Sequence, residues 1–531
     1  MPADPITLSV IQSALIAAAD DMFVVLKRTA MSPIIYEILD AGTGITDADG
    51  NLVGSGAGIP TFIGVLDKAI RRIIEIHGPE SLHDGDLFVT NDPYYGGVTH
   101  LNDVVVAQPI FADGRLVAWA ASIAHWNDVG GMALASASTA ATEIYQEGLR
   151  LPAVKLIDAG QPERSVFEII AVNSRMPDFV RGDLWAQIAA GRRAAGRIER
   201  IVATYGRPAF DEALADLFRE GEQRTLAGLA ALPAGSHAIE EEQDDGAVWR
   251  ATIRIGPERL TIDLSGNPAQ RAAPYNTSRD GAVISGQMIL KVLTDPTLFA
   301  NAGSFRPLEV ITEPGTIFHA TGTAPHGYYF ETRMRLTDML WHCLARAMPD
   351  RLPAGHYASI CGTVIAGEHP DTGRRYTLVE PQMGGWGASS RRDGLSAMYS
   401  AHHGDTYNCP VEICEARYGV DVGWKRLNDA DAGGGQHTGG KGLSINYRPR
   451  TRASVFAGYS HNRVPVWGLA GGDEGGTNGL SIVRADGRRE DYAFASDVNV
   501  EPGDEIHITT ASGGGWGDRR RSTLVDKKNT V

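Results

Sequence analysis

The sequence predicts an α+β protein of several domains, in which an N-terminal α+β region, a helical connector and a β-rich region follow one another. The chain has 531 residues, which is more than one hydrophobic core usually holds. Apolar residues at helical spacing are frequent before about residue 235, whereas alternating apolar and polar residues typical of strands dominate after it. We therefore expect boundaries at 1–180, 181–235 and 236–520, with a polar tail at 521–531.

The composition excludes several classes of protein. The chain is 43% hydrophobic and 21% charged, as in ordinary globular proteins, and its net charge of -15 disfavours binding to nucleic acid or anionic lipid. Two aspartates interrupt the most apolar stretch, 11–26, and the N-terminus lacks the basic start of a signal peptide, so neither a membrane span nor a leader is expected. Four cysteines without a C-x-x-C pair predict no disulfide framework and a cytoplasmic location.

The expected elements follow from periodicity and turn residues. Apolar spacing predicts an opening helix, an amphipathic helix, a helical pair broken near Gly206 and one buried helix, at 6–30, 64–77, 183–232 and 330–348. Two apolar runs around Asp49-Gly50 predict a hairpin at 44–56, and the turn "ADG" predicts a longer one at 104–125. After residue 236, alternating strands and dense glycine predict a β-rich region that contains the buried helix.

One short phrase occurs at both ends of the longer hairpin. It reads His-Leu-Asn-Asp at 100–103 and His-Trp-Asn-Asp at 125–128. If 111 and 114 close the turn, His100 lies across from His125; if 112 and 115 close it, Asn102 does. Either register brings the two imidazoles close enough to bind one metal ion.

Nearby carboxylates complete a predicted metal site. Asp103 reaches the same ion as His100 only if the chain bends at 99–102, and the preceding Pro93, Gly96 and Gly97 favour a bend. Glu37 and Asp40 stand in an otherwise apolar segment, where unpaired charges are costly, so this segment offers a further carboxylate. His100, Asp103 and His125, with Glu37 or Asp40, are thus the predicted ligands of one divalent ion, Zn, Mn or Fe. The alternative is that the histidines are core or capping residues, that the aspartates cap turns, and that Glu37 and Asp40 form a solvent-facing pair.

A second set of charged residues follows the hairpin. Glu143, Glu147 and Arg150 have the spacing of one helix face, which predicts either an exposed ladder of ion pairs, or a carboxylate that supports a metal ligand or acts as a general base beside the metal. The stretch "GQHTGGKG" at 435–442 lacks the Ser or Thr that ends a phosphate-binding loop, so ATP is not expected to bind this chain.

Several blocks of sequence resemble the hydantoinase B family. They are "NDPYYGGVTHLNDVVVAQPIFADGRLVAWAASIAHWNDVGG", "AATEIYQEGLRLPAVKL", "NTSRDGAVISGQM", "RPLEVITEPGTIF", "NCPVEICEARYGV" and "TASGGGWGD", and they span about 5–520. The resemblance implies a partner, a hydantoinase A-type subunit, which is an actin-like ATPase that binds ATP and Mg and phosphorylates the substrate. It also places the family's H-x-x-D on His100 and Asp103, its second histidine on His125 and its early acid on Asp40.

The resemblance implies two alternative functions. The first is the metal-bearing subunit of an ATP-dependent hydrolase of cyclic amides such as hydantoins, lactams or 5-oxoproline, in a heterotetramer or larger hetero-oligomer. We expect that in it Asp128 or Glu147 would orient or deprotonate water and Arg150 would hold phosphate, with Glu143 as a further candidate catalytic residue. The second is a subunit of a ketone carboxylase of the acetone carboxylase type. A third alternative, from another class of protein, is a non-catalytic scaffold with a structural metal. Carboxylase subunits tend to be longer, which favours the hydrolase.

Overall fold

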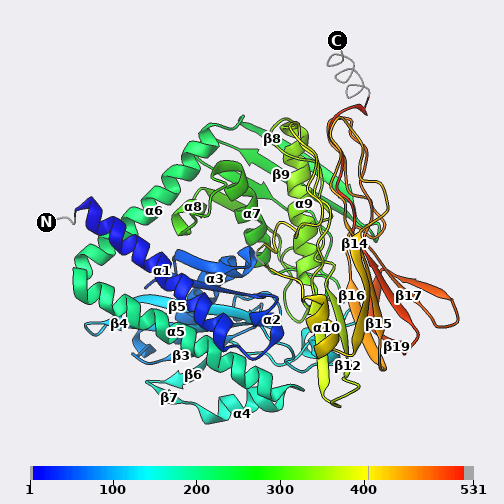
Figure 1. Ribbon diagram of the computed structural model, residues 1–531. Coiled ribbons are helices and arrows are strands. Elements are labelled where there is room, and N and C mark those ends of the chain that lie inside the picture. Colours follow the sequence, from blue (N-terminus) through cyan, green and yellow to red (C-terminus); the bar gives the residue numbers. More distant parts are fainter. Residues whose placement is uncertain (1–3, 405, 520–531) are drawn as a thin grey trace.

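The computed structural model describes residues 4–404 and 406–519, and it is an α+β protein with several sheets, as predicted. Figure 1 shows a helix-covered sheet formed by the N-terminal part of the chain on one side and strands of the C-terminal part on the other. Helix α9 (Tyr329–Ala347) stands between them. The tail predicted at 521–531 lies outside the described residues.

The N-terminal sheet has seven strands in the order β2-β1-β5-β4-β3-β6-β7. The strands are β1 (Ala41–Asp47), β2 (Leu52–Gly58), β3 (Leu87–Thr90), β4 (Asp103–Ala112), β5 (Arg115–His125), β6 (Val154–Asp158) and β7 (Gln161–Pro162). Both predicted hairpins are present, β1–β2 around Asp49-Gly50 and β4–β5 at the centre of the sheet.

The β4–β5 register differs from both predicted pairings. Ala112 pairs with Arg115, so one of the two expected turns is correct, and Asp113 and Gly114 between them have φ of 50° and 71°, as a two-residue primed turn requires. An irregularity between Ile110 and Phe111 then shifts the register by one residue. Asp103, rather than His100 or Asn102, therefore lies opposite His125.

Helices cover both faces of this sheet, because its strands carry apolar side chains on both sides. Ala118, Ala120 and Ala124 of β5 pack with α1 (Pro5–Thr29), α5 (Pro177–Tyr205) and α6 (Arg207–Ala230). The alternate residues Trp119 and Ile123 pack with α3 (Pro60–His77) on the other face. Asp103 and His125 lie on the α3 side, since side chains two apart on a strand share a face.

Helix α1 confirms the predicted opening helix, shifted by one residue from the expected 6–30. By length and composition it could cross a membrane. In the fold it lies along α5 and β2 (Figure 1), and its buried side chains belong to the core of the N-terminal part. These are Ile11, Leu15, Ala18, Ala19, Met22, Phe23 and Leu26.

The expected break in the helical pair is also present. Helix α5 ends and α6 begins at Gly206, which has φ of +81°, a conformation that favours glycine. Their buried residues join α1 and the sheet in one cluster, so this segment is part of the N-terminal core. The other helices are α2 (Pro33–Tyr36), α4 (Arg164–Val172), α7 (Arg279–Thr294), α8 (Ala302–Phe305) and α10 (Val411–Arg417).

The C-terminal part contains three further sheets, of four, four and five strands. The first consists of β8 (Gly235–Glu242), β9 (Val248–Ile255), β10 (Leu260–Asp263) and β11 (Leu308–Ile311). The second consists of β12 (Thr363–Glu368), β13 (Arg375–Glu380), β16 (Ala453–Gly458) and β19 (Phe494–Val500). The third consists of β14 (Val420–Leu427), β15 (Leu443–Pro449), β17 (Gly479–Val483), β18 (Arg489–Tyr492) and β20 (Glu505–Thr509).

The buried helix predicted at 330–348 is α9, and it packs against α7, which the sequence argument missed. All four cysteines are free and buried, as the lack of a disulfide framework predicted. Because α9 contacts the first C-terminal sheet and its N-terminal end reaches β4, it brings side chains of both parts of the chain to one place.

Candidate metal centre

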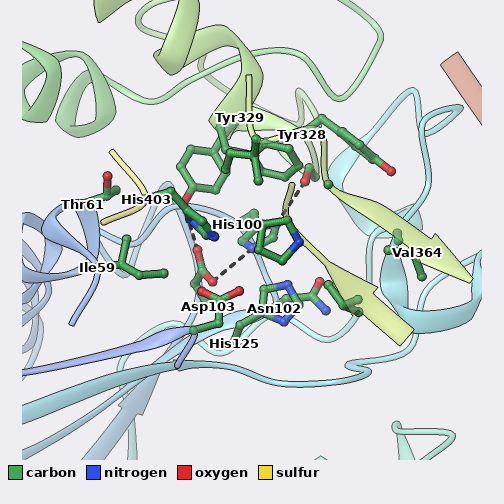
Figure 2. A pocket seen from close by; sticks show the side chains of 18 of the residues that line it. Ile59, Thr61, His100, Asn102, Asp103, His125, Tyr328, Tyr329, Val364 and His403 are labelled. Carbon is green, nitrogen blue, oxygen red and sulfur yellow. Dashed lines mark hydrogen bonds and ion pairs between the residues drawn. The ribbon is translucent and has the colours of Figure 1, made fainter. Parts of the chain in front are cut away.

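Three side chains at the open end of the β4–β5 hairpin form a compact group of metal-ligand type. One nitrogen of His100, one nitrogen of His125 and one carboxylate oxygen of Asp103 all lie within 4.8 Å of one another. Figure 2 shows the three side chains converging beneath Tyr328 and Tyr329. The His100 and His125 rings are 5.2 Å apart between centroids.

A turn before β4 brings His100 and Asp103 to the same side, as the sequence argument required. The Asp103 amide donates to the His100 carbonyl over 3.1 Å, which closes the turn. His100 Nε2 then lies 3.1 Å from Asp103 Oδ1. Asn102, at the corner, donates from Nδ2 to the carbonyls of Trp126 and Ala135 over 3.0 and 3.1 Å, which ties the turn to the chain after β5.

The second nitrogen of His100 fixes the orientation of its ring. Nδ1 lies 3.1 Å from the Gly327 carbonyl, which can only accept, so Nδ1 carries the proton and Nε2 faces Asp103. A backbone carbonyl behind the imidazole is a common support for a metal-binding histidine. Burial alone would lower the pKa of His100, but the Asp103 carboxylate raises it above its ordinary value.

Asp103 is fully buried, and only one of its oxygens is hydrogen-bonded. Oδ2 accepts from Thr99 Oγ1 over 2.5 Å and from the Tyr329 hydroxyl over 3.1 Å. Oδ1 has no hydrogen-bond partner among the described residues, and the charged or chargeable group beside it is the His100 imidazole, with Nε2 at 3.1 Å. A buried carboxylate oxygen without a partner is costly, and a cation between it and the imidazoles would satisfy it.

His125 is equally prepared to bind a cation. Its Nδ1 is buried and lacks a hydrogen-bond partner within the described chain. Burial and the neighbouring His100 lower the pKa of His125 to about 4, so its imidazole is neutral near pH 7, which is the form that binds a metal.

Asp40 lines the same cavity but lies outside the three-residue group. It immediately precedes β1, and its carbonyl accepts from the His125 amide over 3.0 Å. The preceding Leu39 has φ of 66°, a strained conformation for leucine. Burial and then the Asp103 carboxylate raise the pKa of Asp40 well above its ordinary value. Two carboxylates and two imidazoles thus line one cavity, and these are donors of the kind that a divalent cation binds.

The cavity beside the cluster is small and is lined by residues of both parts of the chain. Its volume is about 90 Å³. The walls combine aromatic and aliphatic side chains with a few polar ones (Figure 2). They include Ile59, Thr61, Phe62, Tyr328, Tyr329, Phe330, Arg333, Val364 and His403.

His403, Tyr329 and Arg333 are site residues that the sequence did not predict. His403 lines the same cavity as His100 (Figure 2), and its Nε2 is buried without a hydrogen-bond partner among the described residues. Burial and then the Arg333 charge lower the pKa of His403 to about 3, so it is neutral. A weak sequence signal for His403 is the adjacent His402, because two neighbouring histidines are compatible with a site but do not indicate which residues they contact.

The comparison with known families agrees with this geometry. Residues 4–519 match the family described as hydantoinase B/oxoprolinase. The chain belongs to this family. The resemblance drawn from the sequence blocks is therefore confirmed over nearly the whole chain.

Among members of the hydantoinase B family, a caprolactamase subunit beta from Pseudomonas jessenii is 28% identical over 541 residues, which cover 98% of this chain and 92% of that one. A crystal structure of an ATP-dependent caprolactamase from Pseudomonas jessenii superposes with a TM-score of 0.90 at 25% identity, over 99% of this chain and 94% of that chain. Such relatives are enzymes, and one is named as a subunit.

A structure of an ATP-dependent acetone carboxylase shares the fold, with a TM-score of 0.86 at 18% identity. It covers 99% of this chain but 78% of the acetone carboxylase chain. The hydantoinase B fold is therefore common to proteins with hydrolase and carboxylase names, and the fold alone does not distinguish these activities.

Glu147 of the hydantoinase B chain lies behind the cluster instead of facing the cavity. Its two carboxylate oxygens accept from the amides of His326 and Gly327, over 2.9 and 2.6 Å. The Gly327 carbonyl in turn holds His100 Nδ1. Burial raises the pKa of Glu147 to about 7 despite these two amide bonds. These contacts favour a positioning role for Glu147, because it holds the Gly327 backbone, which in turn orients His100, a candidate metal ligand.

We predict that Glu147→Gln lowers the free energy of unfolding by about 1–3 kcal/mol, because the amide keeps one acceptor and turns its NH2 group toward the other buried backbone N–H. Glu143→Gln is the matched control, since Glu143 is exposed, and its change should stay within about 0.5 kcal/mol. Denaturant unfolding measures both variants. Equal denaturation midpoints for the two variants would contradict a stabilising role of Glu147 at the 326–327 turn.

The helical spacing proposed for Glu143, Glu147 and Arg150 is wrong. The segment contains only a short 3-10 turn, Ile144–Gln146, and then Gly148 with φ of +138°, which ends any helix there. Glu143 consequently faces solvent, whereas Glu147 is buried.

Arg150 and Asp128 also lie away from the cavity. Arg150 donates from Nε to Asp92 over 2.6 Å and lines a separate surface hollow together with Arg175. Asp128 accepts from the guanidinium and the amide of Arg175, each over 2.9 Å. Both charges are already paired, so the structure does not bring the predicted phosphate ligand and the predicted base to the metal candidate.

Proposed function

We propose that this chain is the metal-bearing catalytic subunit of an ATP-dependent hydrolase of cyclic amides. The substrate would be a hydantoin, a lactam or 5-oxoproline, activated by phosphorylation in a hydantoinase A-type, actin-like ATPase subunit. One observation carries the proposal: a set of two imidazoles and a buried carboxylate, with unpaired ligand atoms, lines a small cavity.

The proposed ligands are His100, Asp103 and His125, whereas Asp40, which lines the same cavity outside this group, stays free to accept a proton. A divalent Zn, Mn or Fe ion bound there would polarise the activated carbon centre and lower the pKa of water toward about 7. The chain itself orients His100 through Gly327 and Asp103 through Thr99 and Tyr329, and it surrounds the reacting group with apolar side chains that exclude bulk water.

The proton acceptor is proposed to be a group that faces the cavity. Asp40 and His403 both line it, whereas Asp128 and Glu147 do not appear on its walls. Of these two residues, Asp40 is the better candidate for the base, because burial raises the pKa of its carboxyl group toward the range in which a general base works.

The decisive experiment is turnover by this chain assembled with its A-type partner, offered ATP, Mg and a panel of hydantoin, 5-oxoproline and caprolactam. We expect ADP release coupled to a ring-opened acid, independent of bicarbonate. Acetone with and without bicarbonate is the comparison arm. ADP release that requires both acetone and bicarbonate would identify a ketone carboxylase instead. The 94% coverage of the caprolactamase chain, against 78% of the acetone carboxylase chain, favours the hydrolase.

A further inference from the structure

A buried arginine lines the same cavity as the metal candidate. Arg333, on α9, is 2% exposed, and its side chain reaches the cavity wall. It donates from a terminal nitrogen to Thr61 Oγ1 and lies over the Tyr329 ring, with 5.3 Å from Cζ to the ring centroid. Tyr329 donates a hydrogen bond to Asp103, so Arg333 contacts a side chain that itself contacts the cluster.

The guanidinium is incompletely satisfied. Arg333 Nε is buried and has no hydrogen-bond partner in the described part of the chain. No carboxylate of the described residues pairs with Arg333 at ion-pair distance. Asp103 is the carboxylate whose charge most affects the pKa of Arg333. An arginine stays charged in proteins, and a buried charge without a partner costs several kcal/mol, typically about 3–5 kcal/mol when one member of a buried pair is removed.

Arg335, two residues further along α9, shows the usual solution. It is also buried, but its guanidinium lies 2.6 Å from Asp338 and 3.5 Å from Glu241. The same helix thus carries one arginine neutralised by carboxylates and one that points its charge at a cavity. This contrast indicates that the counter-ion of Arg333 enters from outside the chain.

The charges around the cavity favour an anion. With a divalent cation on His100, Asp103 and His125, the cation and Arg333 together exceed the negative charge of Asp103 and Asp40. The N-terminal end of α3 adds to this, because Ile59, Thr61 and Phe62 line the cavity and the first turn of a helix carries partial positive charge. Thr61 lies in this first turn and also contacts the guanidinium, because its hydroxyl oxygen accepts a hydrogen bond from Arg333.

We propose that Arg333 binds the phosphoryl group that activates the substrate, with α3 and Thr61 beside it, and so places the reacting carbon over the metal site. A guanidinium is suited to this task because its N–H groups match two oxygens of one phosphate. This inference rests on the proposed function and adds the residue that recognises the activated substrate. It also assigns to Arg333 the role that the sequence argument gave to Arg150.

The test uses Arg333→Met in the purified, metal-loaded full chain, with Arg346→Gln, an exposed arginine of the same helix, as the control. The probe is inorganic phosphate, titrated calorimetrically. We expect the wild type and the control to bind phosphate equally and Arg333→Met to bind it at least about ten-fold more weakly, which corresponds to 1.4 kcal/mol. Arg333→Lys should be intermediate, since it keeps the charge but not the paired donors.

Melting temperature and metal content separate binding from folding. Removing a buried charge that lacks a partner should leave the melting temperature of Arg333→Met equal to or above that of the wild type, with metal content unchanged. A lower melting temperature together with unchanged phosphate affinity would make Arg333 a structural residue and overturn the proposal.

A substrate carboxylate is the other possible source of negative charge, and 5-oxoproline supplies it as a second probe. If 5-oxoproline requires Arg333 and phosphate does not, the phosphoryl assignment is overturned. Failure of the proposed function is distinguishable, because phosphate binding needs no turnover. Arg333-dependent phosphate binding in an assembly that opens no ring would count against the hydrolase and leave the phosphoryl assignment standing.

Discussion

Replacement of His100 by alanine is expected to remove the metal from the assembled complex and to abolish ring opening. His100 offers Nε2 to the cluster while the Gly327 carbonyl holds Nδ1, so alanine removes one of the two imidazoles of the group. Loss of a ligand should weaken metal binding by more than the roughly 10–100-fold seen for supporting residues. Because a bound metal contributes several kcal/mol to such reactions, turnover should fall about 1000-fold or more.

Elemental analysis and product formation measure this prediction. His507→Ala is the control, because His507 is a partly exposed histidine on β20 whose ring pairs with Glu505, outside the cavity walls. Retention of stoichiometric metal and full turnover in His100→Ala would refute the site. Chelation of the wild type provides the second arm. A lower melting temperature with unchanged turnover would show that the metal only stiffens the hairpin, which is the scaffold alternative.

Replacement of Asp338 by asparagine is expected to cause the largest loss of stability. Asp338 is fully buried on α9, where Oδ2 accepts from Arg335 over 2.6 Å and from Trp467 Nε1 over 3.0 Å. His461 and His356 lie 3.3 and 3.4 Å from its oxygens. Without the negative charge of Asp338, the carboxylate left near Arg335 is that of Glu241, at 3.5 Å, so the free energy of unfolding should fall by about 3–5 kcal/mol.

The pH dependence of stability provides a second measurement. Burial alone would raise the pKa of Asp338, but bonds from His356 and His461 and the Arg335 charge hold it well below its ordinary value of 3.8. A lowered pKa means that the carboxylate stabilises the fold fully above pH 3.8 and loses this contribution as the pH falls below it. Asp338→Asn should therefore lack part of the wild type's destabilisation in acid.

Asp350→Asn is the matched control, since Asp350 is an exposed aspartate just beyond the same helix. Its denaturation midpoint should stay within about 0.5 kcal/mol of the wild type. Equal midpoints for both variants would show that the buried network around Asp338 contributes little to stability.

Much of the fold was predictable because its elements are encoded locally. The opening helix, both hairpins of the N-terminal sheet, the break at Gly206 and the buried helix α9 follow from apolar periodicity and turn residues. The expected helix face at Glu143 to Arg150 was wrong, because spacing cannot reveal that Gly148 adopts φ of +138°. Helix α7 was missed within a region whose strand patterns dominated the interpretation.

The candidate site was predictable in part for the same reason. His100, Asp103 and His125 are linked by one hairpin, so a count along two strands brings them together without any tertiary information. The register itself was wrong, because the irregularity between Ile110 and Phe111 has no sequence signature, yet a shift of one residue kept the three side chains at the same end.

The sequence by itself determined the α+β class, the hairpin and the pair of histidines with their carboxylate, because these depend on contacts between residues close in the chain. Only the tertiary structure decided what faces them. Tyr329 is 226 residues from the Asp103 that it contacts, and Arg333 is 272 residues from Thr61. Such contacts arise when α9 packs between the two parts of the chain, and no local pattern indicates which of its charges meets a carboxylate and which meets the cavity.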